Sequence, residues 1–278
     1  MPKELSVDRQ QKNLICMQQK GFTEEAERRR TTEKPVIKDG RRASSRCCSL
    51  PFLSSKGKER SMGKYTKEQA IAKVVSCAEK YRDELENRKL LLVCQDKHKN
   101  ITYQEFSFYG RNYLHLTGLK VKRNKENDEL SASNFYFKCL NHKLSPKDVE
   151  FASDGTTCMK LDVLPALITK NLSARMMGDY NSAKPKLYTE KLAGNVKGCM
   201  GFREDASTGN YVPDTVLNED IRNYIQNQTR VIAVFRTSPQ SVVFDEITYV
   251  AKDMDLSMIQ FPKEYQQVLK AINVDKNL

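Results

Sequence analysis

Histidine is rare in this chain, and one histidine lies in a segment whose side chains could do acid–base chemistry. His115 and Thr117 belong to Asn112–Gly118, which follows the alternating segment Ile101–Phe108 and ends in a glycine. Just past a strand, side chains two residues apart point the same way. An imidazole titrates near neutral pH, so it can take up or release a proton. A buried structural turn is the other interpretation of this segment, and the rest of the sequence must decide.

Two further residues could act together with His115. Lys160 lies just inside an expected helix, and Asp179 follows a glycine at an expected strand end. In RNA cleavage the 2′-hydroxyl attacks the adjacent phosphate, while one group removes a proton, another donates one, and a cation stabilises the developing charge. His115, Thr117 and Lys160 could supply these functions without a metal. A solvated lysine and an Asx-turn aspartate are the structural alternatives.

Basic residues elsewhere in the chain could form a phosphate-binding surface. The net charge is +12, and Arg or Lys side chains bind phosphate oxygens well. The candidates are Arg111, Lys138, Arg230 and Arg236. Scattered solvated charge explains the same residues without any ligand.

Several large catalytic classes lack their motifs here. The chain has no P-loop, no dinucleotide-binding fingerprint, no Gly-x-Ser-x-Gly elbow and no two-histidine metal helix. Its eight cysteines contain no C-x-x-C pair, which argues against a structural metal and favours reduced thiols. No apolar run approaches the roughly 20 residues that span a bilayer. The sequence therefore predicts no cofactor, no metal, no membrane segment and a cytoplasmic location.

The first half of the body reads mainly as helices. Thr66 and Gln69 match a capping box, which predicts a helix to about Arg88. Leu90–Gln95 and Ile101–Phe108 then predict a hairpin with a five-residue loop. Further helices are expected at 131–141, from a start at Ser145-Pro-Lys-Asp148, and at 159–172 with a kink or end near Leu164 before Pro165.

Strands predominate in the second half. Short segments separated by glycines precede two clear strands at 229–236 and 242–250. The shorter segments are 175–180, 186–191, 197–203 and 211–217. Early helices and late strands predict an α+β fold, with N-terminal helices packed on a mostly antiparallel sheet. A short helix at 262–273 would close the chain.

Residues 1–61 differ in composition from the rest. They carry 15 Lys and Arg against 8 Asp and Glu, with no sustained hydrophobic period. We expect a disordered basic tail, with an electrostatic nucleic-acid arm as the functional alternative. Met62 as the true start, with 1–61 a misannotated extension, is a third interpretation. Residues 62–278 then form a single domain.

An ordered set of short motifs between Tyr65 and Lys252 resembles a known family. The set runs through Phe106-Ser-Phe, Asn112-Tyr-Leu-His-Leu-Thr-Gly118, Phe135-Tyr-Phe-Lys-Cys-Leu140, Lys143-Leu-Ser145, Lys160-Leu-Asp-Val-Leu164, Gly178-Asp-Tyr-Asn181, Gly194 leading to Met200-Gly-Phe202, Tyr211-Val-Pro-Asp-Thr-Val-Leu217, Asp220-Ile221 and the strand ending at Arg236. It is similar to the fourth phage branch of the barnase–EndoU–colicin–RelE-like (BECR) nucleases. The ordered set is much more specific than any single motif.

The resemblance implies a metal-independent ribonuclease with two early helices on a four-stranded antiparallel sheet. Such proteins serve as toxins or as effectors of phages and mobile elements, so RNA, including tRNA, and a cognate inhibitor are the implied partners. His115 becomes the leading catalytic candidate, followed by Lys160 and Asp179.

Two other functions remain open at this point. A non-catalytic RNA-binding module of the same fold would show salt-dependent binding without turnover. An NAD-dependent ADP-ribosyltransferase is the weaker alternative, because a His-x-Thr element also occurs on strands that bind NAD, but no Arg-Ser-Glu-like partner set is evident.

Overall fold

The structure, a computed structural model, describes residues 64–122, 130–182 and 187–268. The chain divides into two compact units, Met1–Lys58 and Glu59–Leu278, and every described residue belongs to the second. The basic segment 1–61, for which the sequence predicts disorder, lies outside the described residues. No helix in the described part of the chain is long and apolar enough to cross a bilayer.

Helices come early in the described chain and strands predominate late. The α-helices are α2 (Lys67–Glu84), α3 (Tyr113–Thr117), α4 (Ala132–Leu140) and α5 (Thr156–Leu167). The strands are β1 (Lys89–Gln95), β2 (Ile101–Ser107), β3 (Leu119–Val121), β4 (Val149–Phe151), β5 (Met176–Tyr180), β6 (Lys191–Asn195), β7 (Gly198–Glu204), β8 (Tyr211–Leu217), β9 (Ile225–Thr237) and β10 (Phe244–Val250). Short 3-10 helices are η1 (Gly110–Asn112), η2 (Ile221–Asn223), η3 (Leu256–Met258) and η4 (Lys263–Tyr265). This order confirms the predicted α+β class.

The main sheet is antiparallel and is built around its longest strand. Its order is β2-β1-β9-β5-β6-β7-β8, and β10 also pairs with β9. Strand β9 has 13 residues, so it can pair with β1 and β10 near its end and with β5 nearer its start. The sheet is therefore larger than the four-stranded sheet that the family resemblance implied. Strands β3 and β4 form a separate two-stranded sheet.

Helix α2 begins and packs as its sequence predicts. The Thr66 hydroxyl accepts a hydrogen bond from the Gln69 backbone N–H at 3.2 Å, and the Gln69 side chain accepts one from the Thr66 N–H at 2.9 Å. This capping box satisfies two backbone donors that the helix leaves unpaired. The helix ends at Glu84, earlier than the expected Arg88, and Asn87 has a left-handed φ of 56°. The early end lets the chain turn directly into β1.

Strand β1 is buried on both of its faces. Leu90 and Leu92 belong to the core beneath the helices, whereas Leu91 and Val93 belong to a second core. Successive strand residues point to opposite faces, so a continuous apolar strand needs cover on both sides. The β1–β2 hairpin and its turn at 96–100 confirm the predicted hairpin.

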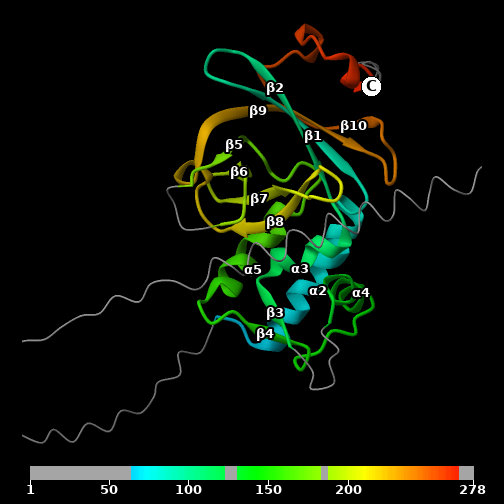
Figure 1. The fold of residues 1–278 in the computed structure, drawn as a ribbon, viewed down its shortest axis with the longest axis vertical. Coiled ribbons are helices and arrows are strands. Elements are labelled where there is room, and N and C mark those ends of the chain that lie inside the picture. The colour runs from blue at the N-terminus through cyan, green and yellow to red at the C-terminus, as the bar shows by residue number, and fades with distance from the viewer. Residues whose placement is uncertain (1–63, 123–129, 183–186, 269–278) are drawn as a thin grey trace, which may run out of the picture. The chain divides into compact units, whose positions relative to one another are not determined.

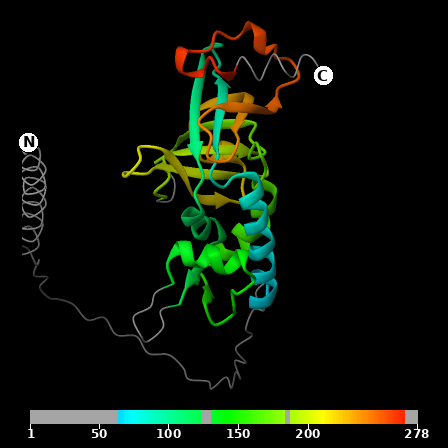
Figure 2. The same ribbon diagram turned by 90° about the vertical axis from the view of Figure 1, so that its right-hand side faces the viewer.

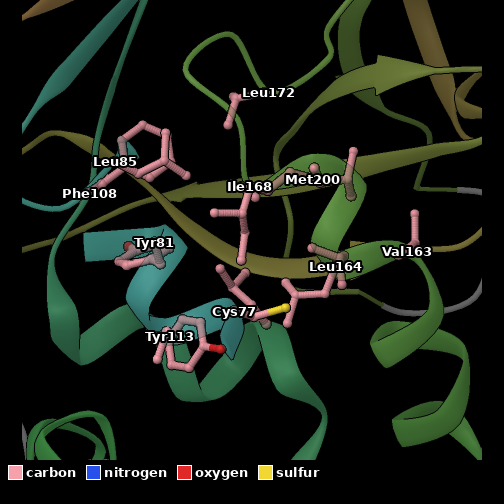
Figure 3. Packing of buried hydrophobic residues seen from close by; sticks show 14 of the residues in the cluster. Cys77, Tyr81, Leu85, Phe108, Tyr113, Val163, Leu164, Ile168, Leu172 and Met200 are labelled. Atoms are coloured by element: carbon pink, nitrogen blue, oxygen red, sulfur yellow. The ribbon is translucent and has the colours of Figure 1, made fainter. Parts of the chain in front are cut away.

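Different parts of the chain cover the two faces. The α-helices lie together on one side of the sheet, and the C-terminal segment with η3 and η4 lies beside the β1–β2 hairpin (Figures 1 and 2). Under the helices, Tyr81 and Tyr113 pack beside Cys77, close to Ile168 and Leu164 (Figure 3). The aromatic rings of Tyr81 and Tyr113 have centroids 5.2 Å apart. This packing fixes α3 against α2.

Three expected element boundaries need correction. Ser145 does not start a helix, because the Asp148 carboxylate accepts the Ser145 backbone N–H at 2.8 Å in a turn that leads into β4. Pro165 does not end α5, which continues to Leu167 with the proline in its last turn. The expected strand 186–191 starts later, since β6 covers Lys191–Asn195. The expected C-terminal helix contains η4 in the described residues and otherwise lies outside them.

Arg236, a predicted phosphate-binding residue, lies buried between α2, β9 and β10. Only 8% of it is exposed. Its guanidinium donates to the Glu84 carbonyl at 2.9 Å and to the Glu84 carboxylate at 3.0 Å, and a further donor contacts Glu246 at 2.7 Å. One side chain thus satisfies the end of α2 and joins it to the sheet.

We expect Arg236→Ala to lower the free energy of unfolding by about 2–3 kcal/mol, because two carboxylates and a helix-end carbonyl lose a charged donor. Urea denaturation followed by circular dichroism measures the loss. Arg230→Ala is the matched control, since Arg230 forms an exposed ion pair with Asp253 and should cost at most about 1 kcal/mol. Equal losses in the two variants would contradict the structural role of Arg236.

Candidate active site

The Asn112–Gly118 segment is a short helix with a glycine stop. Helix α3 follows η1 directly and ends at Gly118, which has a left-handed φ of 68°. The sequence placed His115 and Thr117 just past a strand with parallel side chains, and this placement is wrong. In a helix, residues two apart point in different directions. Accordingly His115 is exposed and Thr117 is fully buried.

Thr117 holds the end of α3 together. Its hydroxyl donates to the Leu114 carbonyl at 2.8 Å and accepts from the Leu119 backbone N–H at 3.1 Å. Both contacts satisfy backbone groups that a helix end leaves unpaired. A direct part for Thr117 in the chemistry stays a prediction.

Helix α5 holds the turn after α3 through two hydrogen bonds. The Lys160 ammonium donates to the His115 carbonyl at 2.9 Å, and the Thr157 hydroxyl donates to the Gly118 carbonyl at 2.6 Å. A Cβ atom on Gly118 would lie 2.9 Å from Lys160 Cδ and 3.1 Å from Thr157 Cα. Gly118 therefore supplies both the left-handed backbone and the space for this approach. The structure brings His115 and Lys160 together, as two of the predicted site residues.

An aspartate from the sheet completes this group. The β7–β8 register shifts between Gly201, opposite Thr215, and Phe202, opposite Pro213. Asp214 is thus the extra residue of a β-bulge, a feature that redirects side chains next to functional sites. Helices α3 and α5 both lie against β8 (Figure 1). The bulge accordingly places Asp214 within electrostatic reach of His115 and Lys160.

Thr189 holds the Asp214 carboxylate in place. Its hydroxyl lies 2.9 Å from one carboxylate oxygen and 3.0 Å from the other. Thr189 is itself buried against Gly201, where a Cβ would lie only 2.7 Å from the Thr189 hydroxyl oxygen. The absence of a side chain on Gly201 therefore permits the Thr189–Asp214 hydrogen bonds.

We call His115, Lys160, Arg203 and Asp214 the central cluster. Arg203 lies near the end of β7, where the strand becomes exposed, and its charge acts on both His115 and Asp214. The cluster thus sets three nitrogen bases or cations around one carboxylate. Sequence reasoning missed Arg203, Asp214 and Thr189. Asp214 lies in a quoted family motif, Tyr211–Leu217, but no spacing in the sequence connects it to His115.

Local electrostatics favour the neutral imidazole. His115 lines a groove, where protein atoms displace part of its water and lower its pKa below 6.5. The positive charges of Arg203 and Lys160 lower the pKa further, and the Asp214 carboxylate opposes them. At neutral pH the His115 side chain is therefore mainly uncharged and able to accept a proton.

Burial shifts the pKa values of Lys160 and Asp214 in the directions expected of their charges. It lowers the pKa of Lys160, against the opposing attraction of Asp214 and Asp154. It raises the pKa of Asp214, against the Thr189 hydrogen bonds and the neighbouring cations. Groups with shifted pKa values that share a cleft are typical of catalytic sites.

A groove opens on one side of His115. It has a volume of about 550 Å³ and an apolar floor with a few polar groups. The lining residues are Leu114, His115, Leu119, Lys120, Val121, Leu130, Ser131 and Ala132. A polymer strand can therefore reach the imidazole without any rearrangement of the buried core.

The remaining predicted residues lie in ion pairs apart from the central cluster. Asp179 of β5 accepts from Lys191 and from Asn227, each at 3.0 Å. Arg111 pairs with Asp205 at 2.7 Å, and Lys138 with Asp148 at 2.8 Å. Arg230 pairs with Asp253. The structure thus distributes the four predicted phosphate-binding residues, Arg111, Lys138, Arg230 and Arg236, over separate contacts. Their roles in substrate binding stay predictions.

Within residues 64–122, 130–182 and 187–268, no group of three or more His, Cys, Asp or Glu side chains is placed to hold a metal ion.

Comparison with known protein families identifies the relationship of this chain. Residues 73–251 match the family model described as phage-Barnase-EndoU-ColicinE5/D-RelE like nuclease4. The chain belongs to this nuclease family. The matched span contains α3, α5, β7 and β8, and therefore all four members of the central cluster. Searches of the curated proteins and of the solved structures found no match to the chain. Membership implies a nucleic-acid substrate for this nuclease.

The close approach at Gly118 can be tested with a second left-handed glycine. Gly118→Ala should destabilise the nuclease by about 2–4 kcal/mol, since it combines backbone strain with a clash against α5. Gly155 has a φ of 79°, but a Cβ there would meet no atom within 4 Å. Gly155→Ala should therefore cost only the backbone strain, about 1 kcal/mol. Thermal unfolding of both variants measures the difference, and equal costs would refute tight docking at Gly118.

Proposed function

We propose that this nuclease is a metal-independent ribonuclease that cleaves RNA by acid–base transesterification. One observation carries the proposal: a neutral imidazole, a lysine and an arginine converge on one partly buried carboxylate at the edge of an open groove. Proton transfer and phosphate stabilisation need these groups and no redox chemistry. The family membership supports the phosphodiester substrate.

His115 is the proposed general base. Its unprotonated imidazole nitrogen removes the proton of the RNA 2′-hydroxyl, and the 2′-oxygen attacks the adjacent phosphorus. The bond from phosphorus to the 5′-oxygen then breaks, giving a 2′,3′-cyclic phosphate and a 5′-hydroxyl. A base with a lowered pKa is free at neutral pH, which offsets its reduced proton affinity.

Lys160 is the proposed partner of His115 in this reaction. One of its three N–H donors binds the His115 carbonyl, so two remain for phosphate oxygens. Burial lowers the pKa of Lys160, which makes the ammonium a stronger acid and suits it to protonate the departing 5′-oxygen. Arg203, which is exposed, supplies a further positive charge toward the phosphate.

Asp214 is proposed to position and balance the cations. Its carboxylate is held by Thr189 and attracts Lys160, Arg203 and His115. Without this negative charge, three neighbouring cationic groups would repel one another when His115 takes up its proton. Asp214 therefore stabilises the imidazolium that forms during the reaction.

The proposed biological setting follows the words in the family description. We propose a phage or mobile-element effector with toxin-like action on cytoplasmic RNA, tRNA included, and with a cognate inhibitor. The phage, colicin and RelE components of that description support this setting.

Loss of His115 should remove most of the activity. We expect His115→Ala to lower kcat by about 100- to 10,000-fold on tRNA or total RNA in EDTA, the usual contribution of a positioned base. His98→Ala is the control, because His98 lies in the exposed hairpin turn. Mass spectrometry should find 2′,3′-cyclic phosphate ends. Equal cleavage by His115→Ala would refute this mechanism, and salt-dependent RNA binding without any turnover would favour a non-catalytic binding module.

The pH dependence should respond oppositely to two charge changes. With His115 as base, kcat/KM of the wild type rises with pH through a pKa below 6.5. Arg203→Gln removes a positive charge, so it should raise the pKa of His115 and move this limb to higher pH. Asp214→Asn removes a negative charge and should move the limb to lower pH. A merely structural role of either residue would leave the position of the limb unchanged.

A further inference from the structure

A second hollow lies beside the central cluster and contains Asp179. It has a volume of about 570 Å³ and is lined by Asp179, Tyr180, Ser182, Leu187, Thr189, Glu190, Lys191 and Tyr211. Thr189 is common to both places, because its hydroxyl binds Asp214 while the residue lines this hollow. A substrate held at the central cluster therefore has a neighbouring chamber one side chain away.

The wall of this hollow combines an acceptor, a donor and an aromatic ring. The Asp179 carboxylate accepts a side-chain donor on each oxygen, Lys191 on one and Asn227 on the other. Each oxygen of an ionised carboxylate can accept a further hydrogen bond. These two donors hold the pKa of Asp179 below its usual range despite partial burial, so the group is an acceptor at neutral pH.

Lys191 joins the polar and aromatic parts of the hollow. Its ammonium lies 3.0 Å from Asp179 and 5.4 Å from the centroid of the Tyr211 ring. Tyr211 packs edge-on against Phe106, with ring centroids 6.4 Å apart, so its position is fixed by the core. A flat ligand beside Tyr211 would thus meet a hydrogen-bond acceptor and a cationic donor next to each other.

We propose that this hollow is a nucleobase subsite for a base with an exocyclic amino group, an inference that rests on the proposed ribonuclease function. The amino group of adenine, cytosine or guanine donates to Asp179, and the neighbouring ring nitrogen or carbonyl accepts from Lys191. Tyr211 provides the aromatic wall, and base–aromatic contact is tolerant of base identity. Uracil has no amino group, so it leaves the Asp179 acceptor without this partner. Asp179 then acts in substrate selection, and the central cluster alone does the chemistry.

The test measures binding separately from cleavage. Fluorescein-labelled 12-nucleotide RNAs of adenine, cytosine or uracil are titrated with His115→Ala protein at low salt, and fluorescence anisotropy gives each Kd. We expect the adenine and cytosine RNAs to bind about tenfold more tightly than the uracil RNA, the usual size of one hydrogen bond to a charged group. Adding Asp179→Asn should reduce this ratio to near one, because the substitution removes an acceptor at nearly constant volume.

Two matched variants separate the parts of the subsite. Asp83→Asn changes an exposed carboxylate of α2 that pairs with Arg82, and it should leave the ratio unchanged. Tyr211→Leu should weaken binding of all three RNAs about equally, whereas Tyr211→Phe retains the ring and should not. Circular dichroism checks the fold of each protein.

Failure of this proposal can be told apart from failure of the ribonuclease proposal. A wild-type ratio near one, an unchanged ratio in Asp179→Asn, an equal loss for all bases in that variant, or no binding of any RNA would each overturn the subsite. Cleavage of RNA by the wild type that depends on His115 would still support the catalytic proposal. Conversely, a base preference that depends on Asp179 without any cleavage would leave the subsite standing and remove the chemistry.

Discussion

The left-handed backbone at Gly118 is the constraint on which the central cluster depends. A residue with a Cβ would strain this turn and collide with Lys160 and Thr157 of α5. With glycine, the Gly118 and His115 carbonyls come within hydrogen-bond distance of α5, so one helix end fixes the other. The imidazole and the ammonium are consequently held by backbone contacts. Side chains positioned in this way need little reordering when a substrate binds, which preserves binding energy for the reaction.

The sheet supplies the opposite charge from a place where regular geometry would not direct it. In an unbroken β7–β8 ladder each residue opposes one partner, whereas the bulge adds Asp214 between the partners of Gly201 and Phe202. Gly201 gives Thr189 room to hold the carboxylate. Two glycines from separate segments thus allow a helix pair and a sheet edge to meet around one carboxylate. The same carboxylate counteracts the neighbouring positive charges that lower the pKa of His115.

Local patterns in the sequence predict the elements better than they predict the site. The capping box at Thr66 and the β1–β2 hairpin follow from spacing alone, since both depend on neighbouring residues. The helical state of α3 does not, because five residues carry too little periodicity to distinguish a helix from a turn. Short motifs single out His115 and Lys160. They cannot single out Arg203 and Asp214, since strand register and a bulge, which are long-range features, bring these two residues to the helices.

The predicted residues also separate by how their charge is used. Arg236 is a strong candidate for phosphate binding by residue type, but its donors satisfy Glu84 and Glu246 in the interior, where an unpaired charge would be costly. Lys160 uses one donor on the His115 carbonyl and keeps two. Residue type specifies which side chains are able to bind phosphate, whereas the number of donors left after folding decides which of them can do so. By this criterion the central cluster is better suited to the substrate than the buried Arg236 pair.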